Sequence, residues 1–299
     1  MRDGRQTSVI MTLYKPWIFS CRWLLLRRLT QLSVLGLFLL GPLAGIWIAK
    51  GNLNSSLILN VLPLTDPYVL MQSLFAGHTL KITAVSGALI VAVFYILVGG
   101  RVYCAWICPI NIITDIAAWC RKRLGIKGNG IAFGRNTRYW ILVLTLLLAL
   151  LTGTIVWELV NPVSMVFRGI VFGIGMSWIF ILAIFLFDLF ISRRGWCGHL
   201  CPVGAFYSLF GKISIIRVSA ANRSQCNDCM DCFNVCPEPQ VIKPALKGVT
   251  RNTSPVILSP NCTNCARCID VCSRHVFKIA TRFNTNVSTH SVNTREAVT

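Results

Sequence analysis

Cys226-Asn-Asp-Cys229-Met-Asp-Cys232-Phe-Asn-Val-Cys236-Pro237 is the stretch that decides the fold of the C-terminal part of this chain. Its four cysteines are separated by two, two and three residues, and the same spacing returns 36 residues later, from Cys262 to Cys272. Three thiolates at the shorter spacing can wrap one corner of a cubane iron–sulfur cluster, and a doubled run is typical of domains with two clusters. The sequence therefore predicts a C-terminal α+β domain that holds two [4Fe–4S] clusters.

In two-cluster bacterial ferredoxins, the fourth cysteine of each run ligates the cluster of the other run. This rule predicts two sets of ligands, which are Cys226, Cys229, Cys232 and Cys272 for the first cluster and Cys262, Cys265, Cys268 and Cys236 for the second. The second run ends in Cys272-Ser273 instead of Cys-Pro, but proline is not a ligand. Zinc and disulfides are less favoured, because zinc sites usually group cysteines in pairs and a reducing cytosol disfavours disulfides. Electron transfer is the expected role, with a structural or sensing role as the alternative.

The remainder of the chain is strongly apolar. Of its 299 residues, 55% are hydrophobic and only 13% are charged, and its mean hydropathy is +0.64. Soluble domains carry about 25% charged residues, so the composition excludes an ordinary soluble enzyme as well as a disordered chain. Four uncharged stretches are long enough to cross a hydrocarbon core of about 30 Å. They are residues 30–49, 82–100, 139–157 and 169–187.

The basic residues indicate how these stretches would be oriented. The net charge is +19, and 26 of the 29 Lys and Arg residues precede the first stretch, separate the second from the third, or follow the fourth. Basic residues accumulate on the cytoplasmic side of membrane proteins. We therefore expect a multi-pass membrane protein, with both termini and the ferredoxin-like domain in the cytoplasm. Because topology accounts for the charge, a nucleic-acid partner is not expected.

The fold class that follows is an α-helical membrane protein with four transmembrane helices in two repeated hairpins, followed by the ferredoxin-like domain. The expected organisation has four parts. They are a basic cytoplasmic N-terminus (1–29), a four-helix membrane domain (30–211), a 2[4Fe–4S] domain (212–282) and a disordered tail (283–299).

A second cysteine motif occurs twice within the apolar part. Cys104-Ala-Trp-Ile-Cys108-Pro109 matches Cys197-Gly-His-Leu-Cys201-Pro202, 93 residues later, and each copy follows the second helix of a predicted hairpin. A spacing of four predicts that both sulfurs of a copy share one helix face, and the proline is expected to stop or kink that helix. If the hairpins pack with pseudo-twofold symmetry, four thiols converge: Cys104, Cys108, Cys197 and Cys201. Three roles remain open, namely a further metal centre, a dithiol–disulfide couple, and simple packing.

The outer loops contain a fainter repeat, Asp66-Pro67 and Asn161-Pro162. Isolated polar side chains also lie near the predicted helix ends. Asp188 is expected to pair with Arg193 or Arg194, with proton relay as the alternative. For His78 and Glu158, solvation at the outer surface is favoured over accepting protons from a quinol.

The combination of these motifs resembles the NapH family, the ferredoxin-type membrane subunits of the periplasmic nitrate reductase system. The resemblance extends from about residue 22 to about residue 282. Besides the cysteine runs, the strings that carry it include Pro63-Leu-Thr-Asp-Pro67, Asn161-Pro-Val-Ser164 and Gly195-Trp-Cys-Gly-His-Leu-Cys-Pro-Val-Gly204.

The resemblance implies an electron-transfer component of a quinol dehydrogenase complex, with quinol as the donor. Electrons would pass to a periplasmic ferredoxin-type subunit of the same system, and then to a membrane-anchored tetrahaem cytochrome c and the periplasmic nitrate reductase. It assigns no catalytic residue to this chain. The alternative function is maturation or redox maintenance of a periplasmic metalloenzyme.

Overall fold

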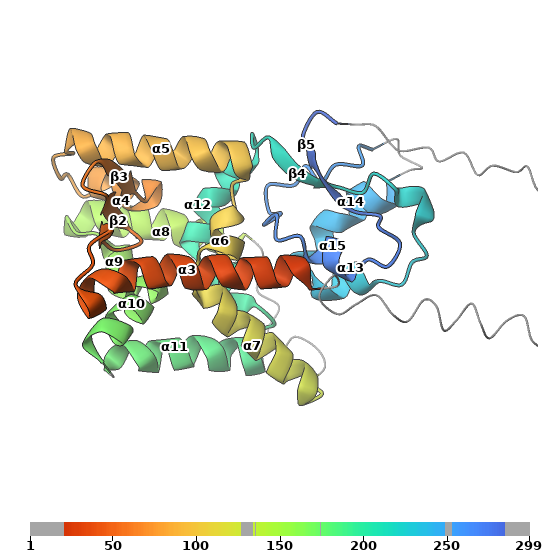
Figure 1. The fold of residues 1–299 in the computed structure, drawn as a ribbon, viewed down its shortest axis with the longest axis horizontal. Coiled ribbons are helices and arrows are strands. Elements are labelled where there is room, and N and C mark those ends of the chain that lie inside the picture. The colour runs from red at the N-terminus through yellow and green to blue at the C-terminus, as the bar shows by residue number, and fades with distance from the viewer. Residues whose placement is uncertain (1–20, 127–133, 135, 174, 249–252, 285–299) are drawn as a thin grey trace, which may run out of the picture. The chain divides into compact units, whose positions relative to one another are not determined.

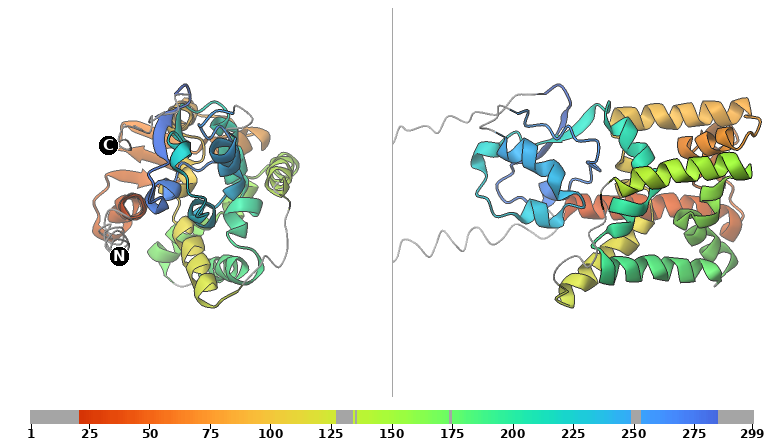
Figure 2. Two further views of the ribbon diagram at one scale, coloured as in Figure 1. Left: turned by 90° about the vertical axis from the view of Figure 1, so that its right-hand side faces the viewer. Right: turned by 180° about the vertical axis from the view of Figure 1, so that it is seen from behind.

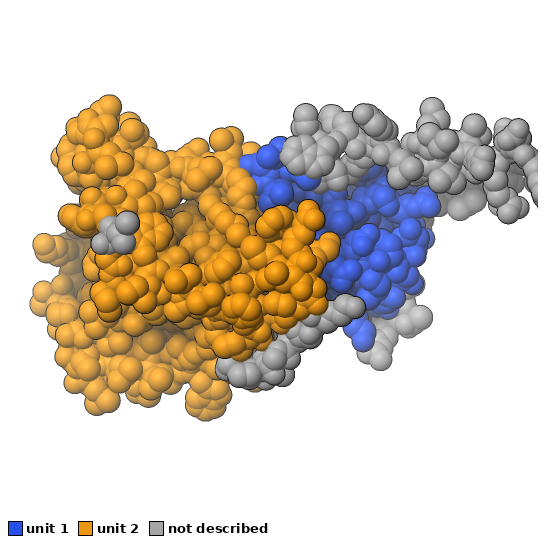
Figure 3. All heavy atoms as spheres, turned by 90° about the horizontal axis from the view of Figure 1, so that it is seen from below, with its two compact units in different colours: residues 1–25, 215–259, 266–299 blue, residues 26–214, 260–265 orange. Residues whose placement is uncertain are grey.

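The computed structural model describes residues 21–126, 134, 136–173, 175–248 and 253–284 (Figure 1). Most of the predicted tail (285–299) and most of the basic N-terminus (1–20) lie outside the described residues. The chain divides into two compact units (Figure 3). The helical unit comprises Leu26–Ser214 and Pro260–Cys265, and the C-terminal unit comprises Met1–Leu25, Ile215–Ser259 and Ala266–Thr299. A short piece of the second cysteine run thus belongs to the helical unit.

Four helices of the helical unit run along a common direction (Figures 1 and 2). They are α3 (Arg22–Ala44), α5 (Ile82–Val98), α8 (Thr137–Thr152) and α11 (Met176–Leu186). Within the described residues, α3 is the one helix that is both long and apolar enough to cross a membrane, while α5, α8 and α11 are shorter apolar helices. Their outer faces carry exposed leucines, such as Leu89 at 64% and Leu150 at 57%.

The helix ends differ from those expected from hydropathy. The stretch 169–187 is not one helix, because α10 (Pro162–Phe172) and α11 are separated at Gly173, whose φ is +90°. Glycine adopts positive φ without the steric penalty that other residues incur. Similarly, α8 ends at Thr152, where Gly153 takes the left-handed conformation that commonly terminates helices. The short helix α9 (Val156–Val160) follows.

The segment between α3 and α5 contains a small sheet that hydropathy did not predict. Strands β1 (Ala49–Gly51), β2 (Ser55–Ile58) and β3 (Leu62–Thr65) pair antiparallel in that order. The β2–β3 turn places Leu59 and Asn60 at positive φ, 51° and 59°. Helix α4 (Pro67–Phe75) begins directly after this sheet.

Shorter elements complete the helical unit after α5 and after α11. Helices α6 (Val102–Trp106) and α7 (Ile110–Arg123) follow α5. After α11 come two π-helical turns, η1 (Phe187–Ile191) and η2 (Trp196–Leu200), and then α12 (Pro202–Gly211). The two copies of the Cys-x-x-x-Cys-Pro motif lie in these connections.

The C-terminal unit is built around one pair of strands from its two ends. Strand β4 (Ile216–Ser219) pairs antiparallel with β5 (Lys278–Thr281). Between them lie three short helices, α13 (Asp231–Val235), α14 (Ile242–Lys247) and α15 (Arg267–Val271). Apolar side chains form the buried core beneath the cysteine loops, including Val218, Ile242, Ile257, Val276 and Phe277.

The backbone at the end of α5 touches that of α12. A side chain at Gly100 would collide with the backbone of Tyr207 and Gly211. We expect Gly100→Ala to destabilise the helical unit by about 1–3 kcal/mol, because neither backbone segment can yield without moving a helix. Gly36→Ala is the matched control, since a Cβ at Gly36 meets nothing within 4 Å. Thermal unfolding in detergent measures both variants, and equal melting temperatures would contradict this account of the contact.

Candidate iron–sulfur sites

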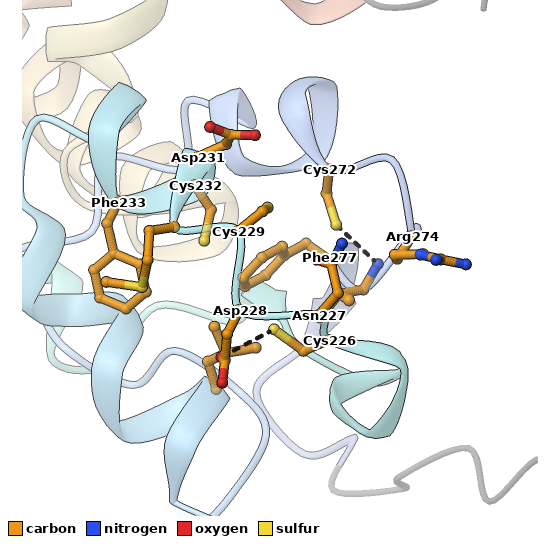
Figure 4. Close-up of a pocket in the computed structure, with 13 residues that line it drawn as sticks. Cys226, Asn227, Asp228, Cys229, Asp231, Cys232, Phe233, Cys272, Arg274 and Phe277 are labelled. Carbon is orange, nitrogen blue, oxygen red and sulfur yellow. Dashed lines mark hydrogen bonds between the residues drawn. The ribbon is translucent and has the colours of Figure 1, made fainter. Parts of the chain in front are cut away.

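One predicted ligand set of the C-terminal unit lines a single pocket. Cys226, Cys229, Cys232 and Cys272 all contribute to its wall, and their sulfur atoms face a common space (Figure 4). The backbone N–H of Val276 donates to the Cys272 sulfur at 3.4 Å. The cysteine that completes this group therefore comes from the second run, which is the arrangement that the crossed assignment requires.

The loops of the two runs have matching backbone conformations. Asp228 and Met230 have φ values of 56° and 62°, and Asn264 and Ala266, 36 residues later, have 47° and 57°. Non-glycine residues rarely adopt positive φ. Four such residues at equivalent positions indicate that the sequence repeat is also a structural repeat.

The second predicted ligand set is divided between the two units. Cys262 and Cys265 belong to the helical unit, whereas Cys236 and Cys268 belong to the C-terminal unit. Among the described residues, no three Cys, His, Asp or Glu side chains are arranged to hold a metal ion. The assignment of both clusters therefore rests on the cysteine spacing and, for the first set, on the shared pocket.

The four cysteines of the duplicated motif line one cavity inside the helical unit. Its wall includes two thiols from each copy, Cys104, Cys108, Cys197 and Cys201. Residues at the N-terminal ends of four helices also line it. Ile110 begins α7, and the residues immediately before α4, α10 and α12 are Asp66, Asn161 and Cys201.

Both copies of the motif use the same unusual turn. The N–H of Cys108 donates to the carbonyl of Tyr103 at 3.0 Å, and the N–H of Cys201 donates to that of Trp196 at 2.9 Å. These bonds span five residues, as in a π-helix. The expectation that each cysteine pair occupies one face of a regular α-helix is therefore wrong.

The prolines of the motif lie at helix starts. Pro202 is the first residue of α12, and Pro109 immediately precedes α7. Proline is favoured at a helix start, because the N–H that it lacks has no helical partner there and its φ already suits a helix. The preceding helices do end before the prolines, at Trp106 and Leu200, and each proline also marks the start of the next helix.

The fainter repeat of the outer loops becomes a pair of helix caps. Oδ1 of Asp66 accepts from the N–H of Tyr68 at 2.9 Å and from the hydroxyl of Tyr207 at 3.1 Å. Oδ1 of Asn161 accepts from the N–H of Val163 at 3.0 Å. Sequence reasoning noticed both Xaa-Pro pairs but placed them in loops at the outer surface, so it missed that both side chains reach the cavity of the four cysteines. An acidic or amide residue before proline was the available signal.

A polar network leads from Asn161 to the surface. The Asn161 amide donates to Oδ1 of Asn54 at 3.1 Å, and the Asn54 amide donates to the Glu158 carboxylate and, at 2.9 Å, to Ser164. Glu158 also forms an ion pair with Arg168 at 3.2 Å. Glu158 is thus held in this network. His78 is separate and exposed, as expected for a solvated residue.

Asp188 is buried near the second motif. Its Oδ1 accepts the N–H of Trp196 at 3.0 Å. Arg194, one of its two expected partners, forms an ion pair with Asp115 at 3.1 Å, and Asp115 also pairs with Arg28. Asp188 therefore binds the turn that carries Cys197, and the ion pairs of Asp115 link α3 and α7 to the same region.

Burial dominates the electrostatics of the cavity. It raises the pKa of the Cys201 thiol to about 12. Burial also raises the pKa values of Cys104, Cys108 and Cys197. The positive charge of Arg101 offsets only part of this rise at Cys104. Burial likewise raises the pKa of the Asp66 carboxyl to about 6. Without a metal, these thiols remain protonated near neutral pH and react poorly as nucleophiles.

Two buried arginines connect the second motif to the second cysteine run. Arg101 donates to the carbonyl of Cys197 at 3.1 Å and to that of Asn261 at 2.9 Å. Arg138 donates to the carbonyl of Gly198 at 3.3 Å and to Oδ1 of Asn261 at 2.7 Å. Because Asn261 directly precedes Cys262, both guanidinium groups join the turn of one motif to the loop of the other.

Comparison with known proteins agrees with these sites. Residues 80–127 and 174–218 match a family model described as a 4Fe-4S binding domain, and residues 224–285 match one described as a 4Fe-4S dicluster domain. The chain is 54% identical to the methylamine utilization ferredoxin-type protein MauN of Paracoccus denitrificans over 90% of this chain and 93% of the relative. It is 49% identical to the ferredoxin-type protein NapH of Escherichia coli, over the same shares.

The chain belongs to the NapH and MauN family of ferredoxin-type proteins. The resemblance inferred from the motifs is thus confirmed, and the protein is an iron–sulfur electron-transfer protein of this family. No solved structure matches the chain. The two matched regions of the first model contain one copy each of the Cys-x-x-x-Cys-Pro motif.

The crossed ligand assignment gives a direct prediction. Cys272→Ala should remove the first cluster, because Cys272 shares the pocket of Cys226, Cys229 and Cys232, and should leave the second. Cys236→Ala is the matched variant, with the opposite result expected. Iron content and EPR spectra of the reduced variants distinguish the clusters. If each variant loses the cluster of its own run, the crossed assignment is wrong.

The raised pKa of Asp66 predicts a pH-dependent stability. The pKa of Asp66 is about 6 in the folded protein, against an ordinary value of 3.8. The native state therefore retains the proton to a higher pH than the unfolded state does. As a result, the free energy of unfolding falls as the pH rises from about 4 to about 6. Asp66→Asn keeps the cap acceptor but has no charge to bury. We expect the variant to exceed the wild type in stability by up to about 3 kcal/mol at pH 7.5. The difference should shrink towards pH 4 in chemical unfolding, and a difference independent of pH would contradict the buried carboxylate.

Proposed function

We propose that this protein is a membrane-bound electron-transfer subunit that passes electrons from the quinol pool toward a periplasmic enzyme system. The observation that carries the proposal is the combination of two features in one family member. One is a helical unit whose outer faces are apolar and exposed. The other is a C-terminal unit whose cysteine loops match a dicluster domain.

The helical unit supports a location in the inner membrane. The apolar helices expose leucines that water would disfavour, and contiguous apolar surface marks an interaction with lipid or protein. With 26 of 29 basic residues on one side of the predicted spans, both termini and the ferredoxin-like domain lie in the cytoplasm. Membrane location also gives the protein access to quinol, which dissolves in the bilayer.

The number of electrons that the two clusters can accept matches the number that a quinol releases. Oxidation of a quinol to a quinone releases two electrons and two protons, and each cubane cluster accepts one electron at a time. Two clusters in one small domain therefore provide a short path for both electrons. The chain's own residues supply the thiolate ligands and the surrounding charges that tune the potentials.

The acceptor system is proposed from the relatives. NapH belongs by name to the nitrate system, so the implied acceptors are a periplasmic ferredoxin-type subunit, a tetrahaem cytochrome c and the periplasmic nitrate reductase. A second candidate rests on the 54% identity to MauN, a methylamine utilization ferredoxin-type protein. In that case the protein would serve maturation or redox maintenance of a periplasmic metalloenzyme, the alternative function stated above.

Reduction by quinol tests the proposal directly. The purified protein, mixed anaerobically with a reduced quinone analogue, should show cluster reduction by EPR, and the Cys232→Ser variant should lose at least part of that signal because Cys232 lies in the first pocket. Cys120→Ser is the control, since Cys120 lies on α7 outside both cysteine-lined pockets. If the quinol does not reduce clusters that are intact, the proposal that quinol is the electron donor is wrong.

Growth of a deletion strain separates the two acceptor candidates. Loss of nitrate-dependent respiration, with normal cofactor content in the reductase, supports the nitrate system. Loss of growth on methylamine, or a reductase that lacks its cofactors, supports the maturation role.

A further inference from the structure

The cavity of the duplicated motif contains a complete set of four soft ligands. Each repeat contributes two thiols, Cys104 and Cys108 from one and Cys197 and Cys201 from the other, and all four line the same wall. The matching five-residue hydrogen bonds of Cys108 and Cys201 show that both copies present their second cysteine through the same turn. Neither repeat alone has enough ligands for a metal centre.

We propose that Cys104, Cys108, Cys197 and Cys201 together ligate one third iron–sulfur cluster, a [4Fe–4S] cubane shared between the two repeats. The inference rests on the proposed electron-transfer function and adds a redox centre inside the helical unit. The match of both regions to a 4Fe-4S binding domain is consistent with it, and the structure assigns the ligands as two from each region.

The backbone around the cavity suits thiolate ligands. The N–H groups of Ile110 and Asn111 favour negative charge on the Cys108 sulfur, and those of Val203 and Gly204 do the same for Cys201. These donors occupy equivalent positions, two and three residues after the cysteine in each copy. Donors directed at cluster sulfurs are one of the means by which proteins tune such centres.

The charge of the surroundings also fits. A cubane held by four thiolates carries a net negative charge, which burial alone would make costly. Two arginines lie beside the second motif at 2% and 0% exposure, Arg101 and Arg138. The starts of α4, α7, α10 and α12 border the cavity, and the N-terminal end of a helix carries partial positive charge.

Part of the second cysteine run lies in the same unit as the cavity. Arg101 and Arg138 contact both the turn of Cys197 and Asn261, and Asn261 is the residue before the predicted ligand Cys262. Within the helical unit, the loop that supplies two ligands of the second cluster is therefore held against the cavity of the third. The proposed centre and the loop that carries Cys262 and Cys265 are thus parts of the same unit.

Iron and sulfide analysis tests the proposal on the full chain purified anaerobically. The wild type should contain about 12 iron atoms, four for each cubane. The variant Cys104→Ser/Cys108→Ser and the variant Cys197→Ser/Cys201→Ser should each contain about eight. The quadruple variant should contain no fewer, because the halves share one cluster. Cys120→Ser is the control and should retain the wild-type content.

A complementary variant excludes misfolding as the explanation. Replacing the eight cysteines of the C-terminal runs by serine should leave about four irons and a cubane Mössbauer signature. About eight irons in the wild type, bound zinc in place of iron, or a disulfide between these cysteines would overturn the proposal. The analysis needs neither quinol nor acceptor, so a third cluster without quinol oxidation would refute the proposed function alone.

Discussion

The guanidinium groups of Arg101 and Arg138 are the constraint on which the rest of the helical unit depends. Each is buried and bonded to backbone carbonyls of the second motif and to Asn261. A buried charge is costly unless its N–H donors have hydrogen-bond partners. Removal of an acceptor would leave a buried donor unpaired and destabilise the protein. These bonds therefore fix the positions of α5, α8, the turn of Cys197 and the start of the second cysteine run relative to one another.

The duplicated architecture divides one site between two halves. Each half has an apolar hairpin, an Xaa-Pro helix start in its outer segment, and a Cys-x-x-x-Cys-Pro turn at its other end. The halves are not identical, since Asp66 in one corresponds to Asn161 in the other. One side of the cavity therefore carries an ionisable group and the other a neutral amide, so that the protein has only approximate symmetry where the four thiols meet.

Local patterns were predicted from the sequence more successfully than helix ends or long-range contacts. The spacing of the cysteine runs is a property of one loop, and the structure shows it as similar positive φ values at Asp228 and Asn264, 56° and 47°. Hydropathy located the apolar helices but not the break at Gly173, because the glycines of this stretch lie between strongly apolar residues and the average hydropathy stays high. The strands β1–β3 are too short to show a clear alternation.

The structural role of two arginines could not be predicted from the distribution of charges. Arg101 and Arg138 were counted with the basic residues that indicate topology, although both are buried and bind carbonyl oxygens. Their partners lie about 60 to 160 residues away along the chain, a separation at which no local pattern can reveal a contact. The caps of Asp66 and Asn161 were visible as Xaa-Pro pairs, but their arrival at the cysteine cavity depends on the tertiary fold.

The assignment of Pro260–Cys265 to the helical unit has a consequence for biosynthesis. Asn261 and Asn264 supply acceptors for Arg101, Arg138 and Trp106, yet the ribosome makes them after every helix of that unit. Until they emerge, the three side chains lack these partners, so the helices alone cannot complete the unit. Final packing of the helical unit therefore waits for synthesis of residues 260–265, close to the end of translation.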